Sequence, residues 1–94
     1  LPNGSGHAGE TETAMMLAIR PDLVRTDQLD PDGEKDGMRV PGVASYHRFD
    51  QRTAHGGVGD PRPATAEMGE DLLVASAAEV AADVQAIRQL KPFA

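Results

Sequence analysis

A long apolar stripe in the C-terminal third of the chain is the feature that most constrains its fold. After the stretch Pro61-Arg-Pro-Ala-Thr, apolar residues recur every three or four positions, at Met68, Leu72, Leu73, Ala75, Val80, Val84, Ile87 and Leu90. This spacing predicts one long amphipathic helix with Thr65 as its N-cap and Pro92 ending it. At about 1.5 Å per residue, the helix is roughly 35 to 40 Å long, more than a fold of this size covers. We therefore expect it to pack against another protein surface.

The rest of the chain offers little material for a core of its own. Its 94 residues suffice for one domain at most. Among its residues are 10 glycines and 7 prolines, many of them between Asp27 and Pro63, with one Tyr, two Phe and no Trp. Small side chains bury little apolar surface, so a self-sufficient core is not expected.

Charge and composition exclude several classes of function. The chain carries 15 Asp and Glu against 9 Lys and Arg, whereas nucleic acids and anionic membranes need a basic face. It has no cysteine, which excludes disulfides, thiolate catalysis and cysteine zinc sites. No apolar run approaches the roughly 20 residues of a membrane span, and no signal peptide is visible. These features predict a cytoplasmic chain that binds neither nucleic acid nor membrane. Because it begins with Leu1 rather than Met, we interpret its start as a product of processing, proteolysis or design.

A second helix is predicted near the N-terminus. Thr11 or Thr13 is a candidate N-cap, the segment 14–19 is rich in helix formers, and a proline follows. Because this segment is apolar nearly all round, we expect a buried helix with Met15 and Met16 in the core.

The middle of the chain reads as turns and short elements. Residues 21–25 predict a short turn or helical cap, and residues 40–49 predict one or two short strands, interrupted by Pro41 and Gly42. Between them lies an acidic turn with Asp30, Asp32, Glu34 and Asp36 spaced as in half of an EF-hand loop. The flanking helix and closing glutamate of that motif are missing, so we expect a solvated surface turn.

Two further segments leave alternatives open. The stretch His55-Gly-Gly-Val-Gly-Asp-Pro precedes the long helix and resembles a phosphate cradle, but it lacks the lysine of a P-loop, which favours a rigid turn beside an active site. The residues Tyr46, His47, Arg48 and Phe49 face a substrate or another subunit, or they form an ordinary mixed strand.

Three ionisable residues, His7, Glu10 and Glu12, stand where a loop enters the first helix. Carboxylates buried there are unfavourable unless they meet a cation or a metal. A histidine and two carboxylates can ligate zinc or manganese, or can move protons. Spacing alone is weak evidence, because a capping glutamate and a loop histidine give the same pattern.

Two motifs together resemble the creatininase (creatinine amidohydrolase) family. The stretch His7-Ala-Gly-Glu-Thr-Glu-Thr-Ala-Met-Met-Leu is similar to the family pattern H-A-G-E-x-E-T-S-x-M-L, which P-x-L-V follows. Gly57-Val-Gly-Asp-Pro-Arg-Pro-Ala-Thr-Ala-Glu-Met-Gly is similar to the family's G-x-G-D-P-x-x-A-T-A-E-x-G. The order of the two motifs is also that of the family, and the resemblance covers most of the chain.

The resemblance implies an α/β fold, with residues 1–94 forming the C-terminal part of a single domain of three-layer α/β/α architecture. Family chains are considerably longer, and this sequence lacks their E-x-H motif, a later Asp and the N-G-H-G-G-N motif, which supply most metal ligands. The resemblance therefore implies either an N-terminal segment on another chain or an inactive remnant.

The implied activity is metal-dependent hydrolysis of a C–N bond in a small cyclic or linear amide, usually by a hexamer. Creatinine, formamide-bearing nucleotide intermediates, small lactams and short peptides are the substrates known in the family. The implied cofactors are two divalent metal ions (Zn, Mn or Fe), which activate water and polarise the carbonyl group without a nucleophilic side chain.

Residue roles follow from the match of motifs. Glu12 corresponds to a metal ligand, Glu10 to a general base or acid, and His7 to the histidine that protonates the leaving nitrogen or holds the oxyanion. Ala14 replaces the usual serine, a change expected to affect packing only. The alternative is a non-catalytic assembly subunit, which has no reason to keep three polar groups at a helix entrance.

Overall fold

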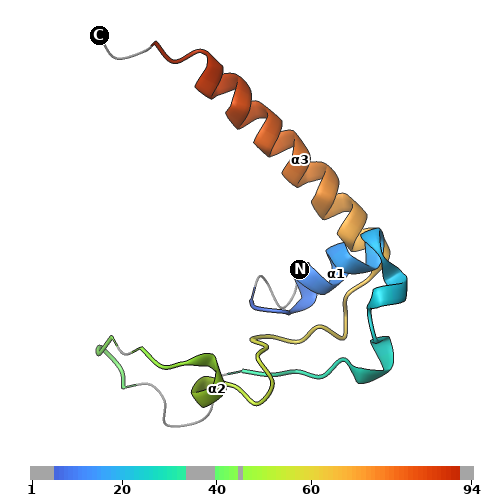
Figure 1. The fold of residues 1–94 in the computed structure, drawn as a ribbon, viewed down its shortest axis with the longest axis vertical. Helices are drawn as coiled ribbons and strands as arrows, with labels where there is room; N and C mark the ends of the chain where they lie inside the picture. Colours follow the sequence, from blue (N-terminus) through green and yellow to red (C-terminus); the bar gives the residue numbers. More distant parts are fainter. Residues whose placement is uncertain (1–5, 34–39, 45, 92–94) are drawn as a thin grey trace.

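The computed structural model describes residues 6–33, 40–44 and 46–91. In chain order they form helix α1 (Glu10–Ile19), the 3-10 helices η1 (Pro21–Leu23) and η2 (Thr26–Gln28), and helices α2 (Phe49–Arg52) and α3 (Ala66–Arg88). Extended pairing in these ranges is limited to two isolated antiparallel bridges, which join His7 to Val58 and Asp32 to Gly59. The described part of the chain is therefore helical, with loops that bring distant segments together (Figure 1).

Helix α3 confirms the prediction made from the apolar stripe. Its 23 residues begin directly after Thr65, whose hydroxyl oxygen accepts a hydrogen bond from the Met68 N–H at 3.1 Å. Regular helix ends at Arg88, and Pro92, the predicted stop, lies outside the described residues. Local signals were sufficient here because an N-cap and a regular apolar period act within a few residues of each other.

Helix α1 begins earlier than its predicted caps. Gly9 is the N-cap, so the predictions of Thr11 or Thr13 at that position were wrong, and both lie inside the first turns. The backbone turns at Ala8, where φ is 52°. The Glu12 carboxylate reaches back to accept the Ala8 N–H at 2.5 Å, and this bond satisfies a backbone donor just ahead of the helix as a capping side chain does.

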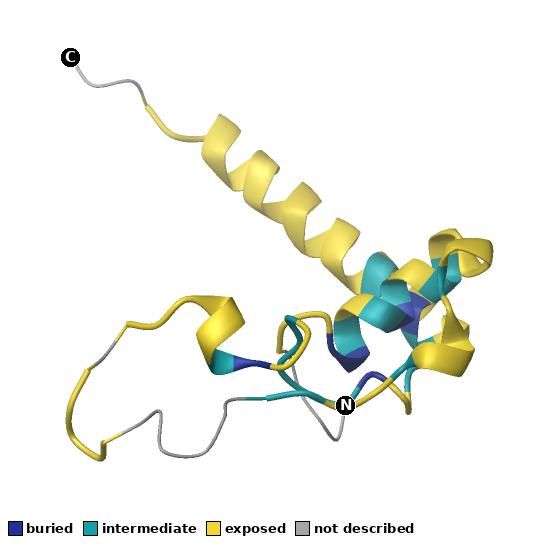
Figure 2. Cartoon of the chain, turned by 60° about the horizontal axis from the view of Figure 1, so that its bottom comes forward, coloured by how far each residue is buried: buried dark blue, intermediate teal, exposed yellow. Residues whose placement is uncertain are grey.

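The two longer helices meet at a close backbone contact. Gly69 in α3 is buried against the Ala14 backbone of α1, and Ala14 has no exposed surface. Figure 2 shows buried and half-buried residues where α1 crosses the first turns of α3, while the rest of α3 is exposed. The serine-to-alanine difference noted at position 14 therefore falls at the point where the helices touch.

Much of the apolar surface of both helices is uncovered. Met16 is 40% exposed and Ile19 is 56% exposed, so the prediction of a wholly buried first helix was wrong, as was the placement of Met16 in the core. The radius of gyration is 17.7 Å, against about 12 Å for a compact chain of this length. Helix α3 projects away from the other elements (Figure 1), so a small self-contained core cannot enclose either helix.

The segment from Val40 to Phe49 holds no strand among its described residues, which leave out Ser45. Instead, the Val43 N–H donates to the Val40 carbonyl oxygen at 3.0 Å, closing a turn over the Pro-Gly pair, and Phe49 opens the short helix α2. The strand prediction failed because the segment has no neighbouring strand here to pair with.

No helix in the described ranges has the length and hydrophobicity needed to cross a lipid bilayer.

Candidate active site

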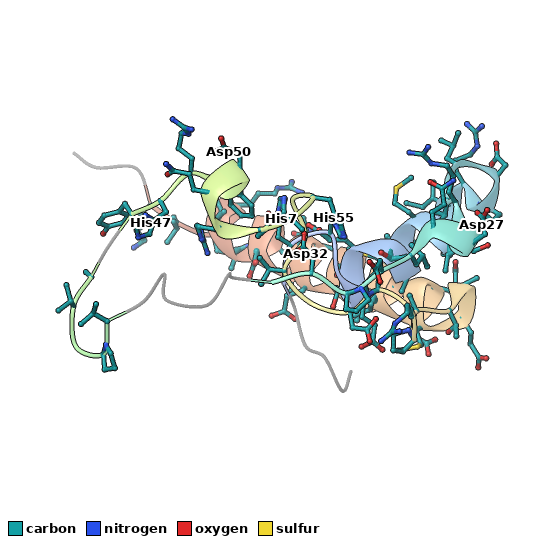
Figure 3. All side chains as sticks on the ribbon, turned by 90° about the horizontal axis from the view of Figure 1, so that it is seen from below. His7, Asp27, Asp32, His47, Asp50 and His55 are labelled. Atoms are coloured by element: carbon teal, nitrogen blue, oxygen red, sulfur yellow. The ribbon has the colours of Figure 1, made fainter. Side chains whose placement is uncertain are left out.

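Three segments distant in the sequence meet around His7. The His7 N–H donates to the Val58 carbonyl oxygen at 3.0 Å, and the Val58 N–H donates back to His7 at 2.7 Å. One residue further on, Asp32 and Gly59 exchange the same pair of bonds at 3.0 and 2.8 Å. Figure 3 shows His7, Asp32 and His55 gathered at this point. The glycine-rich segment thus forms a turn held beside the motif histidine.

The His7 side chain packs against an aromatic ring from α2. The ring centroids of His7 and Phe49 lie 4.8 Å apart with a 52° angle between their planes. The Arg52 guanidinium lies 4.9 Å from the centroid of the same Phe49 ring, within the range of a cation–π contact. Phe49, for which the sequence left several roles open, therefore helps to hold the exposed imidazole in place.

The two glutamates of the motif have different surroundings. Glu10, the first residue of α1, is 1% exposed, and its Oε1 atom has no access to solvent. Glu12, two residues later, is exposed, with one carboxylate oxygen on the Ala8 N–H. Both carboxylates lie in the first turn of α1, where the helix dipole favours negative charge. Of the two, Glu12 is open to a ligand in the described structure.

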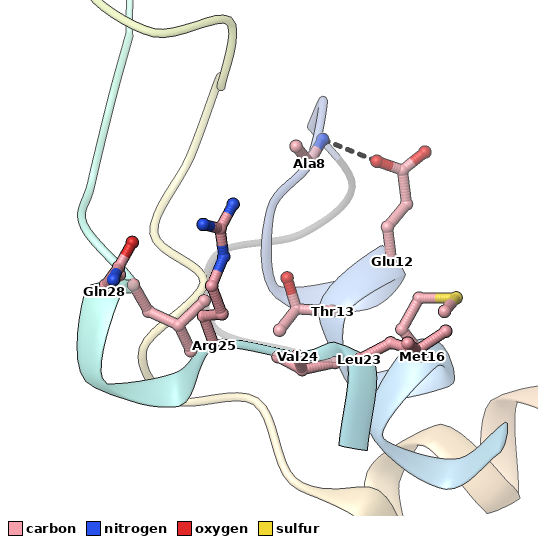
Figure 4. Close-up of a pocket in the computed structure, with 9 residues that line it drawn as sticks. Ala8, Glu12, Thr13, Met16, Leu23, Val24, Arg25 and Gln28 are labelled. Atoms are coloured by element: carbon pink, nitrogen blue, oxygen red, sulfur yellow. Dashed lines mark hydrogen bonds between the residues drawn. The ribbon is translucent and has the colours of Figure 1, made fainter. Parts of the chain in front are cut away.

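A pocket of about 500 Å³ opens beside Glu12 (Figure 4). Its wall combines α1 with the segment that follows it, and it is lined by Ala8, Glu12, Thr13, Met16, Leu23, Val24, Arg25, Gln28 and Leu29. Arg25 is the cation of this lining. The volume lies in the range of small-molecule sites, and the wall offers apolar surface together with a few polar groups of both signs.

A smaller cavity of about 160 Å³ lies next to this pocket and shares Ala8, Gln28 and Leu29 with it. Its other lining residues include Asp30, His55 and Gly57. The glycine-rich turn and the motif helix therefore border one continuous region. The turn is fixed by backbone bonds to His7, and its place beside an active site stays a prediction.

Asp32 corrects the prediction of a solvated acidic turn. Its side chain is only 6% exposed, and its carboxylate accepts backbone N–H groups from Gly33, Ala54, His55 and Gly57 at 2.8 to 3.2 Å. Hydrogen bonds from backbone amides, that of His55 foremost, hold the pKa of the Asp32 carboxyl well below its usual range. Of the other three acidic residues of the predicted half EF-hand, Asp30 has a side chain that is 72% exposed, as predicted, and Glu34 and Asp36 lie outside the described residues.

Whether a metal ion fits this site depends on which His, Asp and Glu side chains lie close together. Within the part of the chain that the structure describes, no three His, Asp or Glu side chains cluster closely enough to hold a metal ion. Glu12 presents a carboxylate at the pocket wall, which is a ligand type that zinc and manganese accept. The described residues therefore do not form a metal site by themselves, and the role of Glu12 as a ligand stays a prediction.

Two elements of the site escaped the sequence reading. Asp32 stands in an Asp-Pro-Asp-Gly turn signal, and such aspartates commonly bond nearby backbone, as Asp32 does with the Gly33 N–H. Its three other backbone partners lie 22 to 25 residues away. Arg25 follows the motif helix within a short turn, and no periodicity marks it as a pocket residue.

Comparison with known proteins identifies the family. The sequence model of the Creatininase family, described as creatinine amidohydrolase, matches residues 2–84. A protein of Mycolicibacterium smegmatis named mycofactocin precursor peptide peptidase is 41% identical over 76 residues, which cover 74% of this chain and 28% of that protein. The chain thus spans little more than a quarter of the length of this relative. No solved structure matches significantly. With the family model covering most of the sequence, and with both motifs in place, the chain belongs to the creatininase family, whose fold is of the α/β class.

Proposed function

We propose that this chain supplies part of the active site of a metal-dependent amidohydrolase. The observation that carries the proposal is the position of Glu12, which lies in the family motif and presents its carboxylate to a pocket of about 500 Å³. Membership of the creatininase family supports the reaction class, hydrolysis of a C–N bond.

The proposed active unit contains more than the residues described here. We propose that residues 1–94 form the C-terminal part of a three-layer α/β/α domain, that an N-terminal segment on another chain completes it, and that the completed units assemble as a hexamer in the cytoplasm. Two observations support a missing surface: the exposure of Val80, Val84 and Ile87, at 60%, 49% and 64%, and the 28% coverage of the relative. Apolar faces of this extent are usually covered in the assembled protein.

Two divalent metal ions (Zn, Mn or Fe) are the proposed cofactors, with Glu12 as this chain's ligand to one of them. When bound, such a pair lowers the pKa of a water molecule towards neutrality and polarises the substrate carbonyl. The remaining ligands are proposed to come from the completing segment, because the described residues contain no three-ligand cluster.

This chain's own contribution to the reaction is proton transfer and orientation. His7 is proposed to deliver a proton to the leaving nitrogen of the amide, since an amine leaves poorly until it is protonated. The Phe49 ring, 4.8 Å away, limits how the imidazole can turn. Glu10 is proposed as a second acid or base. Because it is 1% exposed in the described structure, it would exchange protons through neighbouring groups rather than directly with bulk water.

The pocket favours a substrate with both an apolar portion and a charged or polar portion. Leu23, Val24 and Met16 provide the apolar wall, and Arg25 provides a cation. The relative from M. smegmatis is named for peptidase activity on a precursor peptide, so we place a short peptide first among the amide substrates, ahead of small cyclic amides such as creatinine.

The alternative is a non-catalytic assembly subunit. The contact that favours it is the bond from the Ala8 N–H to Glu12, because this bond gives Glu12 a structural role without any metal. The substitution Glu12→Gln distinguishes the catalytic role of Glu12 from the purely structural one. Glutamine keeps an amide oxygen that accepts the Ala8 N–H, but it is a far poorer metal ligand than a carboxylate.

The experiment is metal analysis of the purified complete protein. Glu12→Gln should lose one of the two metals while keeping the thermal stability of the metal-free protein. Glu79→Gln is the matched control, since Glu79 is an exposed glutamate on α3 that lies outside both family motifs, and it should keep both metals. Full metal occupancy in Glu12→Gln would show that Glu12 is not a ligand.

A further inference from the structure

The Asp32 carboxylate accepts several backbone hydrogen bonds from the loop of residues 54–59, which contains Val58. One oxygen, Oδ1, accepts the N–H groups of Gly33 and Ala54 at 2.8 and 3.0 Å. The other, Oδ2, accepts those of His55 and Gly57 at 2.8 and 3.2 Å and lies 3.0 Å from the His55 ring Nδ1. A carboxylate that accepts several backbone amides fixes the path of those amides.

The same residue is connected to His7 through the backbone. Asp32 exchanges two hydrogen bonds with Gly59, and the adjacent Val58 exchanges two with His7. The residue before His7 also lies close to the same loop, because a Cβ atom on Gly6 would overlap the Val58 carbonyl group. A shift of the 54–59 loop must therefore move the His7 backbone with it.

We propose that Asp32 is a positioning residue for His7, acting through the 54–59 loop that its carboxylate and backbone hold in place. The proposal deepens and rests on the proposed function, in which His7 delivers a proton to the substrate. Asp32 itself does not contact the reacting atoms in this scheme. Its task is to set where the imidazole stands relative to the Phe49 ring and the pocket.

The bonding pattern favours this role over a purely local one. If Asp32 served only its own turn, the bond to Gly33 would suffice. The three other amides belong to the loop 22 to 25 residues further along the chain. Asp30 offers the contrast: it is two residues away, its side chain is 72% exposed, and its contact with the loop is a carboxylate oxygen 3.8 Å from His55 Nε2.

The test compares Asp32→Asn with Asp30→Asn in the complete, metal-loaded protein. The first readout is the NMR signal of the His7 ring in histidine-labelled protein, assigned by its loss in His7→Ala. Its chemical shift contains a ring-current contribution because Phe49 lies 4.8 Å away. Asp32→Asn should move this signal and Asp30→Asn should leave it in place. An unmoved signal in Asp32→Asn would overturn the proposal.

The second readout is hydrolysis of short peptides, followed with an amine-reactive fluorescent reagent. Asp32→Asn should lower kcat by about 10- to 100-fold, the effect of a misplacement near 1 Å, with KM and metal content nearly unchanged. In a His7→Ala background the same substitution should have no further effect, because residues acting through one another are non-additive. If Asp32→Asn lowered kcat in the His7→Ala background as much as in the wild type, Asp32 would act independently of His7.

The two proposals fail in distinguishable ways. If His7→Ala turns over peptides at the wild-type rate, His7 is not the proton donor, and the ring signal still decides whether Asp32 positions it. If Asp32→Asn does not fold, hydrogen exchange in the wild-type protein decides instead. The Ala54, His55 and Gly57 amides should then exchange slowly despite lying in a loop. Exchange at the rate of an unstructured chain would show that the carboxylate does not hold them.

Discussion

Gly69 of α3 lies directly on the Ala14 carbonyl group of α1, so closely that a single added methyl group would overlap it. The contact involves backbone atoms on the α1 side, which cannot move aside as a flexible side chain can. It joins the long helix to the first turns of α1, where Glu10 and Glu12 reside. The position of the motif carboxylates therefore depends on a glycine that is 59 residues from Glu10 and 57 residues from Glu12 in the chain.

Replacing Gly69 with alanine should destabilise the protein. Alanine gains about 1 kcal/mol over glycine in helix propensity, but overpacking against backbone loses about 1 to 3 kcal/mol. We expect the second effect to win, with a lower free energy of unfolding in denaturant melts of the complete protein. Ser76→Ala, an exposed change on the same helix, is the control and should be slightly stabilising. Equal or higher stability in Gly69→Ala would show that the helices do not touch there.

Removing the His7 imidazole should reduce turnover while leaving both metals bound. Loss of a general acid lowers kcat by about 10² to 10⁴, and substrate affinity should change much less. Steady-state kinetics and metal analysis of His7→Ala provide the measurement. His47→Ala is the control, because His47 is exposed and stands apart from His7 (Figure 3). Loss of a metal in His7→Ala would identify His7 as a ligand instead.

Asp32 should make stability depend on pH in the acid range. Backbone amides lower the pKa of its carboxyl in the folded state, whereas an unfolded aspartate has a pKa of about 3.9. The carboxylate therefore stabilises the fold above about pH 4, and this stabilisation is lost as the pH falls further. Thermal melts from pH 6 to pH 2 should fall more steeply for the wild type than for Asp32→Asn. The other ionisable groups near this carboxylate are His55, which contacts it, and Asp30, which contacts His55. If the melting temperatures of the wild type and of Asp32→Asn fell in parallel with pH, a group other than Asp32 would cause the acid sensitivity.

The isolated chain of 94 residues should not fold as a stable monomer. Its accessible surface is 7283 Å², against about 5200 Å² for a compact protein of this mass. We expect weak, uncooperative helix unfolding by circular dichroism and self-association in sedimentation. A cooperative melt of a monomeric species would contradict the prediction.

The parts of this fold that the sequence predicted are those with local causes. Thr65 and the stripe after it define α3 within one stretch of chain, and the turn at residues 21–25 follows from its proline. The candidate site was located at His7, Glu10 and Glu12 because a family motif marks it. The contact of His7 with Phe49 and the bonds of Asp32 to the later loop are long-range. They depend on how loops close, which neither periodicity nor capping signals encode.

The crossing of α3 over α1 near one end gives the long helix the geometry of a lever. From Gly69 to Arg88 the helix extends about 28 Å at its usual rise, so a turn of about 5° at the fulcrum displaces the far end by about 2.5 Å. Conversely, a partner that binds the outer half of α3 restricts the angle between α3 and α1 tightly, because it acts far from the point where the two helices cross. If the proposed completing segment covers Val84 and Ile87, which are exposed here, it would thereby set the tilt of α1 and the direction in which Glu12 faces.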